Sequence, residues 1–172
     1  MTSARRRAEE ALDELGLRGP ATVDALVQHL AEQRQRPLLV ETAPAAFFAD
    51  AACGAWWESE HLDLVLVPED ADPVLRDHTV RHELAHMILR HPGAACSGEA
   101  LREVLARVVP DLDAGTVLGA LHRRSDYGVA AEREAEVLAS LLTLRDATEA
   151  DRLGDREAEA LRRALSGRLR RG

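Results

Sequence analysis

The spacing of apolar residues changes twice along the chain and divides it into three parts. Over residues 4–35 the apolar positions recur every three or four residues, which is the period of a helix that buries one face. This spacing predicts one amphipathic helix over residues 4–15. It predicts a second that starts after Thr22, a suitable capping residue, and carries Val23, Leu26 and other apolar residues on one side.

The middle part has the pattern of β-strands. The stretch "PLLVET" reads as a short strand, and "FFADAACGAWWESEHLDLVLVPED" has the apolar runs and turn residues of a hairpin. We expect its first strand to end near Trp57, its turn to fall around Ser59 and Glu60, and "LDLVLV" to be its second strand. The sequence therefore predicts a small antiparallel β-sheet.

Helical spacing returns after the hairpin and continues to the end of the chain. We expect helices over roughly residues 73–91, 98–109, 115–123, 128–147 and 149–169. Helices, a small sheet and more helices, in that order, predict a single α+β domain over residues 1–172 that is mostly helical. Residues 1–21 and 148–172 are interpreted as an N-terminal helical extension and a C-terminal charged helical extension of this domain.

Composition restricts the partners that we expect. The chain has 172 residues and a formal net charge of -8, which argues against direct binding of nucleic acid. The basic residues at 4–7 and 167–172 are interpreted as solvated helix ends. Cys53 and Cys96 suggest no disulfide framework, and the sequence shows neither a signal-peptide pattern nor an apolar run of about 20 residues. We therefore expect a cytoplasmic protein that does not bind membranes.

The segment "RHELAHMILRH" contains two histidines four residues apart, with a glutamate directly after the first. On a helix His82 and His86 stand one above the other, so both rings can reach one metal ion, and zinc binds imidazole at about 2.0–2.1 Å. Glu83 is turned by about 100° from His82 and can reach a water on the metal without being a ligand. Zinc lowers the pKa of such a water towards about 7, and Glu83 would pass its proton to the leaving amine.

The neighbours of the histidine pair favour a metal site over a chance combination. Val80, Leu84, Met87 and His91 fall on one stripe, roughly opposite His82 and His86, so we expect this helix to be covered on both sides. A helix at the surface would instead leave the imidazoles in water. His78 and His91 lie nearby, and each is either a spare ligand or a polar residue near a helix end.

A catalytic zinc ion usually has three protein ligands and one open position, so a third ligand must come from elsewhere in the chain. The best candidate segment is "YGVAAEREAEVLASLLTL", where small residues beside the acidic ones would let a second helix come close. One glutamate could bind the metal while another accepts a hydrogen bond from a ligand histidine. Local spacing does not choose among Glu132, Glu134 and Glu136, and acidic residues on a helix usually face solvent.

"HELAHMILRH" followed by "EREAEVLASLL", with the hairpin "GAWWESEHLDLVLVPED" before them, resembles the ImmA/IrrE family of zinc metallopeptidases. The sequence is particularly similar to small actinobacterial members labelled as toxin components of toxin–antitoxin systems. The resemblance implies a gluzincin-like arrangement in which His82, His86 and Glu132 bind Zn²⁺ and Glu83 is the general base. It implies a second-shell role for Glu136, at a position where the family usually has Asp or Asn.

The resemblance extends over roughly residues 22–145 and is most specific at the two helices. The chain has "VLAS" where the family tends to have a Phe-Ala pair, and it lacks the usual Met-Pro ending. These differences limit what can be transferred about the substrate. A donor that stabilises the oxyanion is also needed for attack on a carbonyl, and Tyr127 and His122 are the candidates.

Three functions remain open at this point. The first is a zinc-dependent peptidase that cuts a protein partner, a DNA-binding repressor or an antitoxin, in regulatory proteolysis. The second is a regulatory module that keeps zinc for structure and contacts a DNA-binding partner without cleaving it. The third is a stand-alone toxin with another target. Glu83 favours the peptidase, because a purely structural metal site needs no base.

Overall fold

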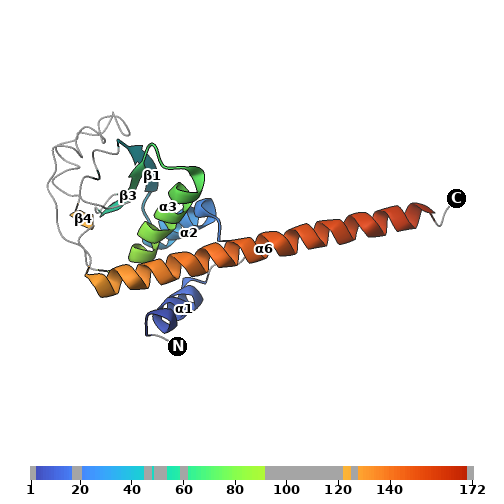
Figure 1. The fold of residues 1–172 in the computed structure, drawn as a ribbon, viewed down its shortest axis with the longest axis horizontal. Coiled ribbons are helices and arrows are strands. Elements are labelled where there is room, and N and C mark those ends of the chain that lie inside the picture. Colours follow the sequence, from blue (N-terminus) through green and yellow to red (C-terminus); the bar gives the residue numbers. More distant parts are fainter. Residues whose placement is uncertain are drawn as a thin grey trace.

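The described part of the chain is an α+β fold made mostly of helices. The computed structural model describes residues 3–16, 21–44, 48, 54–58, 62–91, 122–124 and 128–169. In chain order the elements of these ranges are α1 (Ser3–Leu15), α2 (Val23–Arg34), β1 (Leu38–Ala43), β2 (Ala55–Glu58), β3 (Asp63–Pro68), α3 (Pro73–Ile88), β4 (His122–Arg124) and α6 (Val129–Leu169) (Figure 1). The predicted class is confirmed at this level.

The sheet is mixed, and its strand order is β1-β3-β2-β4. β2 and β3 form the predicted hairpin, with Trp56 opposite Val65 in an antiparallel pair, and β4 pairs antiparallel with the other side of β2. The prediction of a purely antiparallel sheet is wrong, because β1 runs parallel to β3 with Leu38 opposite Asp63. β1 pairs with β3, which runs in the same direction, and not with β2, which follows β1 in the sequence. Apolar alternation shows which side chains share a face of a strand, but it carries no information on the direction of the neighbouring strand.

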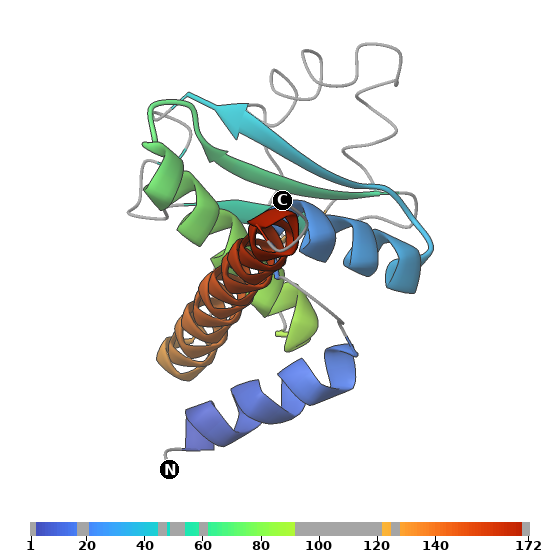
Figure 2. The ribbon, with the colours of Figure 1, turned by 90° about the vertical axis from the view of Figure 1, so that its right-hand side faces the viewer.

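β3 is buried on both faces. Val65 and Val67 belong to the hydrophobic cluster that also includes residues of α2 and α3, and Leu64 and Leu66 are fully buried on the opposite face. A strand covered on both sides reads as a continuous apolar run, which explains the stretch "LDLVLV". Both α2 and α3 lie on the same side of the sheet, as Figure 2 shows, and they pack on β1 and β3 respectively.

The N-terminal part of α6 lies between α3 and α1 (Figure 1). Ala135, Leu138 and Leu142 of α6 are fully buried in the hydrophobic cluster, and α1 contributes Ala8 and Leu15 to the same cluster. Each buried leucine contributes about 1.5–3 kcal/mol relative to an exposed one. The first helix of the chain is thus packed against the helix that carries the three candidate glutamates.

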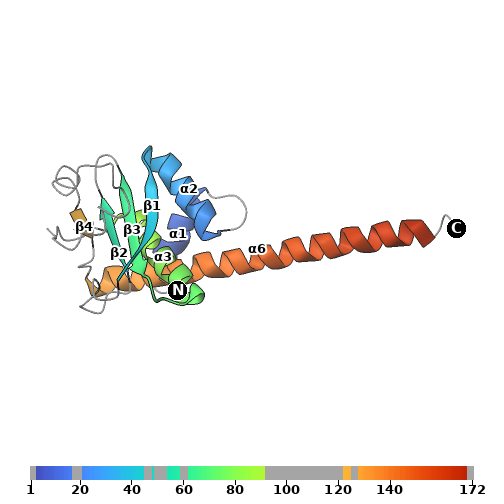
Figure 3. The ribbon, with the colours of Figure 1, turned by 90° about the horizontal axis from the view of Figure 1, so that it is seen from above.

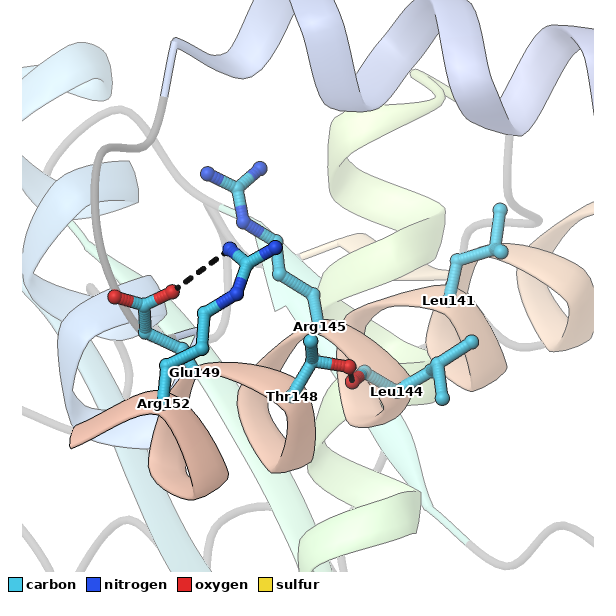
Figure 4. A pocket seen from close by; sticks show the side chains of 6 residues that line it. All are labelled: Leu141, Leu144, Arg145, Thr148, Glu149 and Arg152. Atoms are coloured by element: carbon cyan, nitrogen blue, oxygen red, sulfur yellow. Dashed lines mark hydrogen bonds and ion pairs between the residues drawn. The ribbon is translucent and has the colours of Figure 1, made fainter. Parts of the chain in front are cut away.

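α6 is one continuous helix, so the predicted end of a helix at residue 147 and the new start at 149 are wrong. At this point the hydroxyl of Thr148 donates to the carbonyl of Leu144 at 2.7 Å (Figure 4). In the next turn Arg152 Nη1 lies 3.4 Å from Glu149 Oε2 (Figure 4). A threonine that bonds back to the preceding turn satisfies its hydroxyl without leaving the helix. The second half of α6 runs far past the sheet and the other helices (Figure 3).

The prediction of a helix over residues 115–123 is wrong at its end, because His122 and Arg123 belong to β4. β4 is a three-residue strand whose partners are in β2, so pairing with a strand distant in sequence overrides the local pattern. The predicted helix at 98–109 lies outside the described residues, as do Cys53 and Cys96. No helix in the described ranges is both long enough and apolar enough to cross a membrane.

Candidate metal centre

α3 begins and ends at well-defined caps. The side chain of Asp72 accepts hydrogen bonds from the backbone N–H groups of Val74 and Leu75, both at 2.9 Å, and Pro73 occupies the first helical position. The helix ends at Ile88, three residues before the predicted end at 91, because Arg90 takes a left-handed conformation with φ 55. The turn that follows returns the chain towards the helix.

The expectation that this helix is covered on both sides is confirmed. Val80 and Leu84 are fully buried in the hydrophobic cluster, and on the other side His86 is 0% exposed and Glu83 5%. His82 is only partly buried, with 21% of its side chain exposed. The histidine pair therefore lies at the border between the interior and solvent, which is where a reactive site must be to receive a substrate.

Three donor atoms from two helices come together at this border. His82 Nε2 lies 3.0 Å from His86 Nε2 and 3.2 Å from Glu132 Oε2, and the distance from His86 Nε2 to Glu132 Oε2 is 3.8 Å. Donors bound tetrahedrally to one zinc ion at about 2.0–2.1 Å lie about 3.3 Å from one another. Two imidazoles and one carboxylate at these separations therefore fit a single divalent ion, and within the described ranges they are the group that could hold one.

The structure separates the contacts of the three glutamates, which local spacing cannot distinguish. Glu132, in the first turn of α6, contacts the Nε2 atoms of both histidines. Glu136 lies one turn later, where its Oε2 is 3.6 Å from His82 Nδ1 and 3.2 Å from His78 Nε2. Its side chain thus reaches the far nitrogen of His82. Glu134 points elsewhere and contacts His91.

Burial sets the protonation of the inner histidine. Desolvation, followed by the proximity of the His82 and His91 rings, lowers the pKa of His86 to about 2. Burial also lowers the pKa of His91, and this effect is opposed by a hydrogen bond with the carboxylate of Glu134, which raises the pKa. His86 is consequently neutral near pH 7, and a neutral imidazole is the form that binds a metal ion.

Glu83 occupies a different place from the three donors. Its side chain lies against Gly54, the residue directly before β2, and beside Thr79 one turn earlier on α3. A Cβ atom on residue 54 would be 3.1 Å from Glu83 Oε1. The candidate base therefore packs against the residue that precedes β2, and it is not one of the three grouped donors.

The candidates for an oxyanion donor are placed only in part. Tyr127 lies outside the described residues. The backbone of His122 belongs to β4, where it pairs with Glu58 of β2. Trp56 and Trp57 are both buried, and Trp56 Nε1 donates to Asp63 Oδ1 at 3.0 Å, so neither indole is an exposed part of a groove.

Arg81 is a residue of the site that the sequence reasoning missed. It precedes His82 and is 2% exposed, and its guanidinium donates to Asp77 at 2.6 Å, to Asp146 of α6 at 2.8 Å and to the backbone carbonyl of Ala21. A buried arginine that bonds to α6 holds the two helices in register beside the donor atoms. The only local signal is the Asp77–Arg81 spacing of four residues, which is common on exposed helices.

Comparisons of the chain with protein-family models, with curated proteins and with solved structures find no match. The function of the candidate site is therefore inferred from the chemistry and positions of its donor atoms.

Proposed function

We propose that the protein is a zinc-dependent peptidase with a gluzincin-like site, in which His82, His86 and Glu132 hold the ion and Glu83 is the general base. The observation that carries this proposal is the meeting of two imidazole nitrogens from α3 and one carboxylate oxygen from α6 within 3.8 Å. Two histidines and one glutamate are a donor set of catalytic zinc sites, which keep a fourth position open.

Each residue of the site would have a distinct role in peptide hydrolysis. A bound zinc ion supplies a Lewis acid that lowers the pKa of water and polarises a carbonyl group. Glu83 takes the proton of the attacking water and gives it to the leaving amine nitrogen. Glu136 orients His82 from the side of Nδ1, at 3.6 Å. The exposed edges of His82 and Glu132 mark the side from which a peptide would approach, because His86 is fully buried.

The substrate in this proposal is a protein. The resemblance of "HELAHMILRH" and "EREAEVLASLL" to the ImmA/IrrE family supports a DNA-binding repressor or an antitoxin as the target, and a cytoplasmic site of action. Under this proposal the contact with nucleic acid belongs to the partner, in keeping with the net charge of -8.

Metal content is the first test. Protein purified from zinc-containing medium should hold about one zinc ion per chain, and His82→Ala or His86→Ala should remove it, as measured by elemental analysis. His29→Ala is the matched control, because His29 is a histidine of α2 whose Nε2 contacts the carbonyl of Leu15 at 2.6 Å. A folded wild type that holds no metal would contradict the proposal.

Cleavage is the second test. The chain is co-expressed with a candidate regulator, a DNA-binding repressor or an antitoxin, and fragments of that regulator are identified by mass spectrometry. Glu83→Gln should keep the zinc and yield no fragments, because an amide cannot take up the proton. Equal cutting by Glu83→Gln and the wild type would show that Glu83 is not the base.

The second half of α6 supports a different function, a zinc-containing binding module or toxin component that contacts a DNA-binding partner without cutting it. Residues 151–157 are exposed and carry both charge signs, and this part of α6 extends away from the rest of the fold (Figure 1). An extended charged helix is a suitable contact for another protein. If this function is correct, the wild type and Glu83→Gln should bind the regulator equally and leave it intact.

A further inference from the structure

His86 makes contacts through both of its ring nitrogens. Nε2 faces the donor cluster, 3.0 Å from His82 Nε2, while Nδ1 lies 2.9 Å from His91 Nδ1. The two rings meet edge to face, with centroids 5.0 Å apart. Both side chains are buried, with His91 only 3% exposed. Burial restricts how two imidazoles can be placed, because each protonated ring nitrogen needs an acceptor and each unprotonated one needs a donor.

The contacts continue from His91 to the surface. His91 Nε2 lies 3.2 Å from Glu134 Oε2, and the same oxygen is 2.8 Å from Arg7 Nη1 of α1. Arg7 also donates to the carbonyl of Leu89, at the C-cap of α3. A continuous series of polar contacts thus runs behind the candidate ligand His86. It joins residues of α1, of the turn that follows α3, and of α6.

A bound metal ion would set which atom donates and which accepts in each contact of this series. An imidazole that binds a metal ion through Nε2 carries its remaining proton on Nδ1, so with a metal ion bound His86 would donate to His91 Nδ1. His91 would then carry its own proton on Nε2 and donate a hydrogen bond to Glu134. The carboxylate of Glu134 accepts from both His91 and the guanidinium of Arg7. Every donor in this series would then face an acceptor.

The backbone explains how His91 reaches its position. The N–H of His91 donates to the carbonyl of His86 at 3.0 Å, and the N–H of Arg90 donates to the carbonyl of Met87 at 3.1 Å. These two bonds, with Arg90 in the left-handed conformation, form a Schellman motif. The motif reverses the chain directly after α3 and places the ring of His91 against the ring of His86.

We propose that His91 is a positioning residue for the metal ligand His86, and that Glu134 fixes the tautomer and the orientation of His91. This inference rests on the proposed metal site, and it assigns His91 neither to the ligands nor to the reacting groups. It replaces both interpretations that the sequence left open, a spare ligand and a polar residue at a helix end. Loss of such an outer partner typically lowers metal affinity about 10–100-fold.

The test compares zinc affinity, measured by competition with a chelating dye, across variants of the full chain. His91→Phe keeps an aromatic ring but offers no acceptor, and it should weaken zinc binding about 10–100-fold. His91→Asn places a carbonyl oxygen near the position of Nδ1 and should recover most of this loss. His29→Phe, which replaces a histidine on α2, should leave the affinity unchanged.

A spectroscopic measurement separates positioning from simple packing. In the cobalt-substituted protein, His91→Phe should shift the d–d absorption bands, and His91→Asn should return them towards the wild-type position. Glu134→Gln, which keeps the shape of the side chain, serves if His91→Phe does not fold. It should lower the zinc affinity less than His91→Phe but measurably.

Two results would overturn the proposal in distinguishable ways. If folded His91→Phe and Glu134→Gln bind zinc within twofold of the wild type with unchanged cobalt spectra, the positioning role is wrong while the metal site stands. If the wild type binds no zinc, the metal site and the positioning role both fail. Absence of peptide cleavage, with zinc binding weakened by His91→Phe, would reject the peptidase alone.

Discussion

Gly54 and Glu83 lie so close together that a side chain at position 54 has no room. A Cβ atom on Gly54 would be 2.6 Å from Thr79 Cγ2 and 3.1 Å from Glu83 Oε1. β2 begins at the next residue, so the strand cannot move away without disturbing its pairing with β3. A glycine is thus required where the sheet touches the helix that carries the candidate base and the two histidines.

Gly54→Ala should therefore slow cleavage more than it reduces metal binding. The new methyl group must push Glu83 or Thr79 aside, and a displacement of about 1 Å at a reacting group can cost about 100-fold in rate. The rate of fragment formation and the zinc content are measured on the same preparation. Gly128→Ala is the matched control, because nothing lies within 4 Å of a Cβ at the start of α6. Cleavage by Gly54→Ala at the wild-type rate would contradict this account of Glu83.

Asp146→Ala should destabilise the fold. It removes one acceptor from the buried guanidinium of Arg81, whose bonds to Asp77 and to the carbonyl of Ala21 remain. The expected loss in the free energy of unfolding is about 1–3 kcal/mol, measured by urea denaturation. Asp151→Ala changes an exposed residue of the same helix and should stay within about 0.5 kcal/mol of the wild type. Equal stability of the two variants would show that the Arg81–Asp146 contact does not hold α6 in place.

Arg90→Gly should stabilise the protein. Arg90 is exposed and has φ 55, a conformation that costs a residue with a Cβ about 1–2 kcal/mol and costs glycine almost nothing. After the greater entropy of an unfolded glycine is subtracted, we expect a gain of about 0.5–1 kcal/mol in the free energy of unfolding. Gln35→Gly, at the left-handed C-cap of α2, should give a similar gain. A lower free energy of unfolding in Arg90→Gly would mean that the arginine side chain stabilises the fold by more than the left-handed backbone conformation destabilises it.

The metal-free protein should lose stability as the pH falls below about 6.5. In the folded chain the pKa of His86 is lowered from 6.5 to about 2, and that of His91 is lowered too, so between these values the unfolded chain binds more protons. The free energy of unfolding then rises with pH, by up to about 1.4 kcal/mol per pH unit for each histidine. Urea denaturation of chelator-treated protein at about pH 5.5 and 7.5 measures the slope. His86→Gln should have a smaller slope, and an unchanged slope would be contrary to this expectation.

Several features of the site follow from local sequence. The four-residue spacing places His82 and His86 on one side of a helix whatever the rest of the chain does, because the helical repeat is a property of the backbone. The capping residue Asp72 and the following proline mark where that helix begins. The antiparallel pairing of β2 with β3 is predictable for the same reason, since the two strands are close together in sequence, while the expected turn around Ser59 and Glu60 lies outside the described residues.

Other features depend on contacts between segments far apart in the chain. The crossing of α3 and α6 decides that Glu132 meets both histidines, while Glu134 meets His91 and Glu136 meets His78 and His82. All three glutamates have the same charge and lie within five residues of one helix, so their local sequence cannot distinguish them. Only packing sets which side of α6 touches α3.

The sequence by itself determined the pair of histidines, the glutamate between them and the apolar faces that bury their helix. Tertiary structure decided which glutamate lies beside both histidines, the direction of β1 and the place of His91 behind His86. The physical reason is the range of the forces involved. Helical repeat and capping act within a few residues, whereas strand order and helix crossing are set by burial of apolar surface contributed by the whole chain.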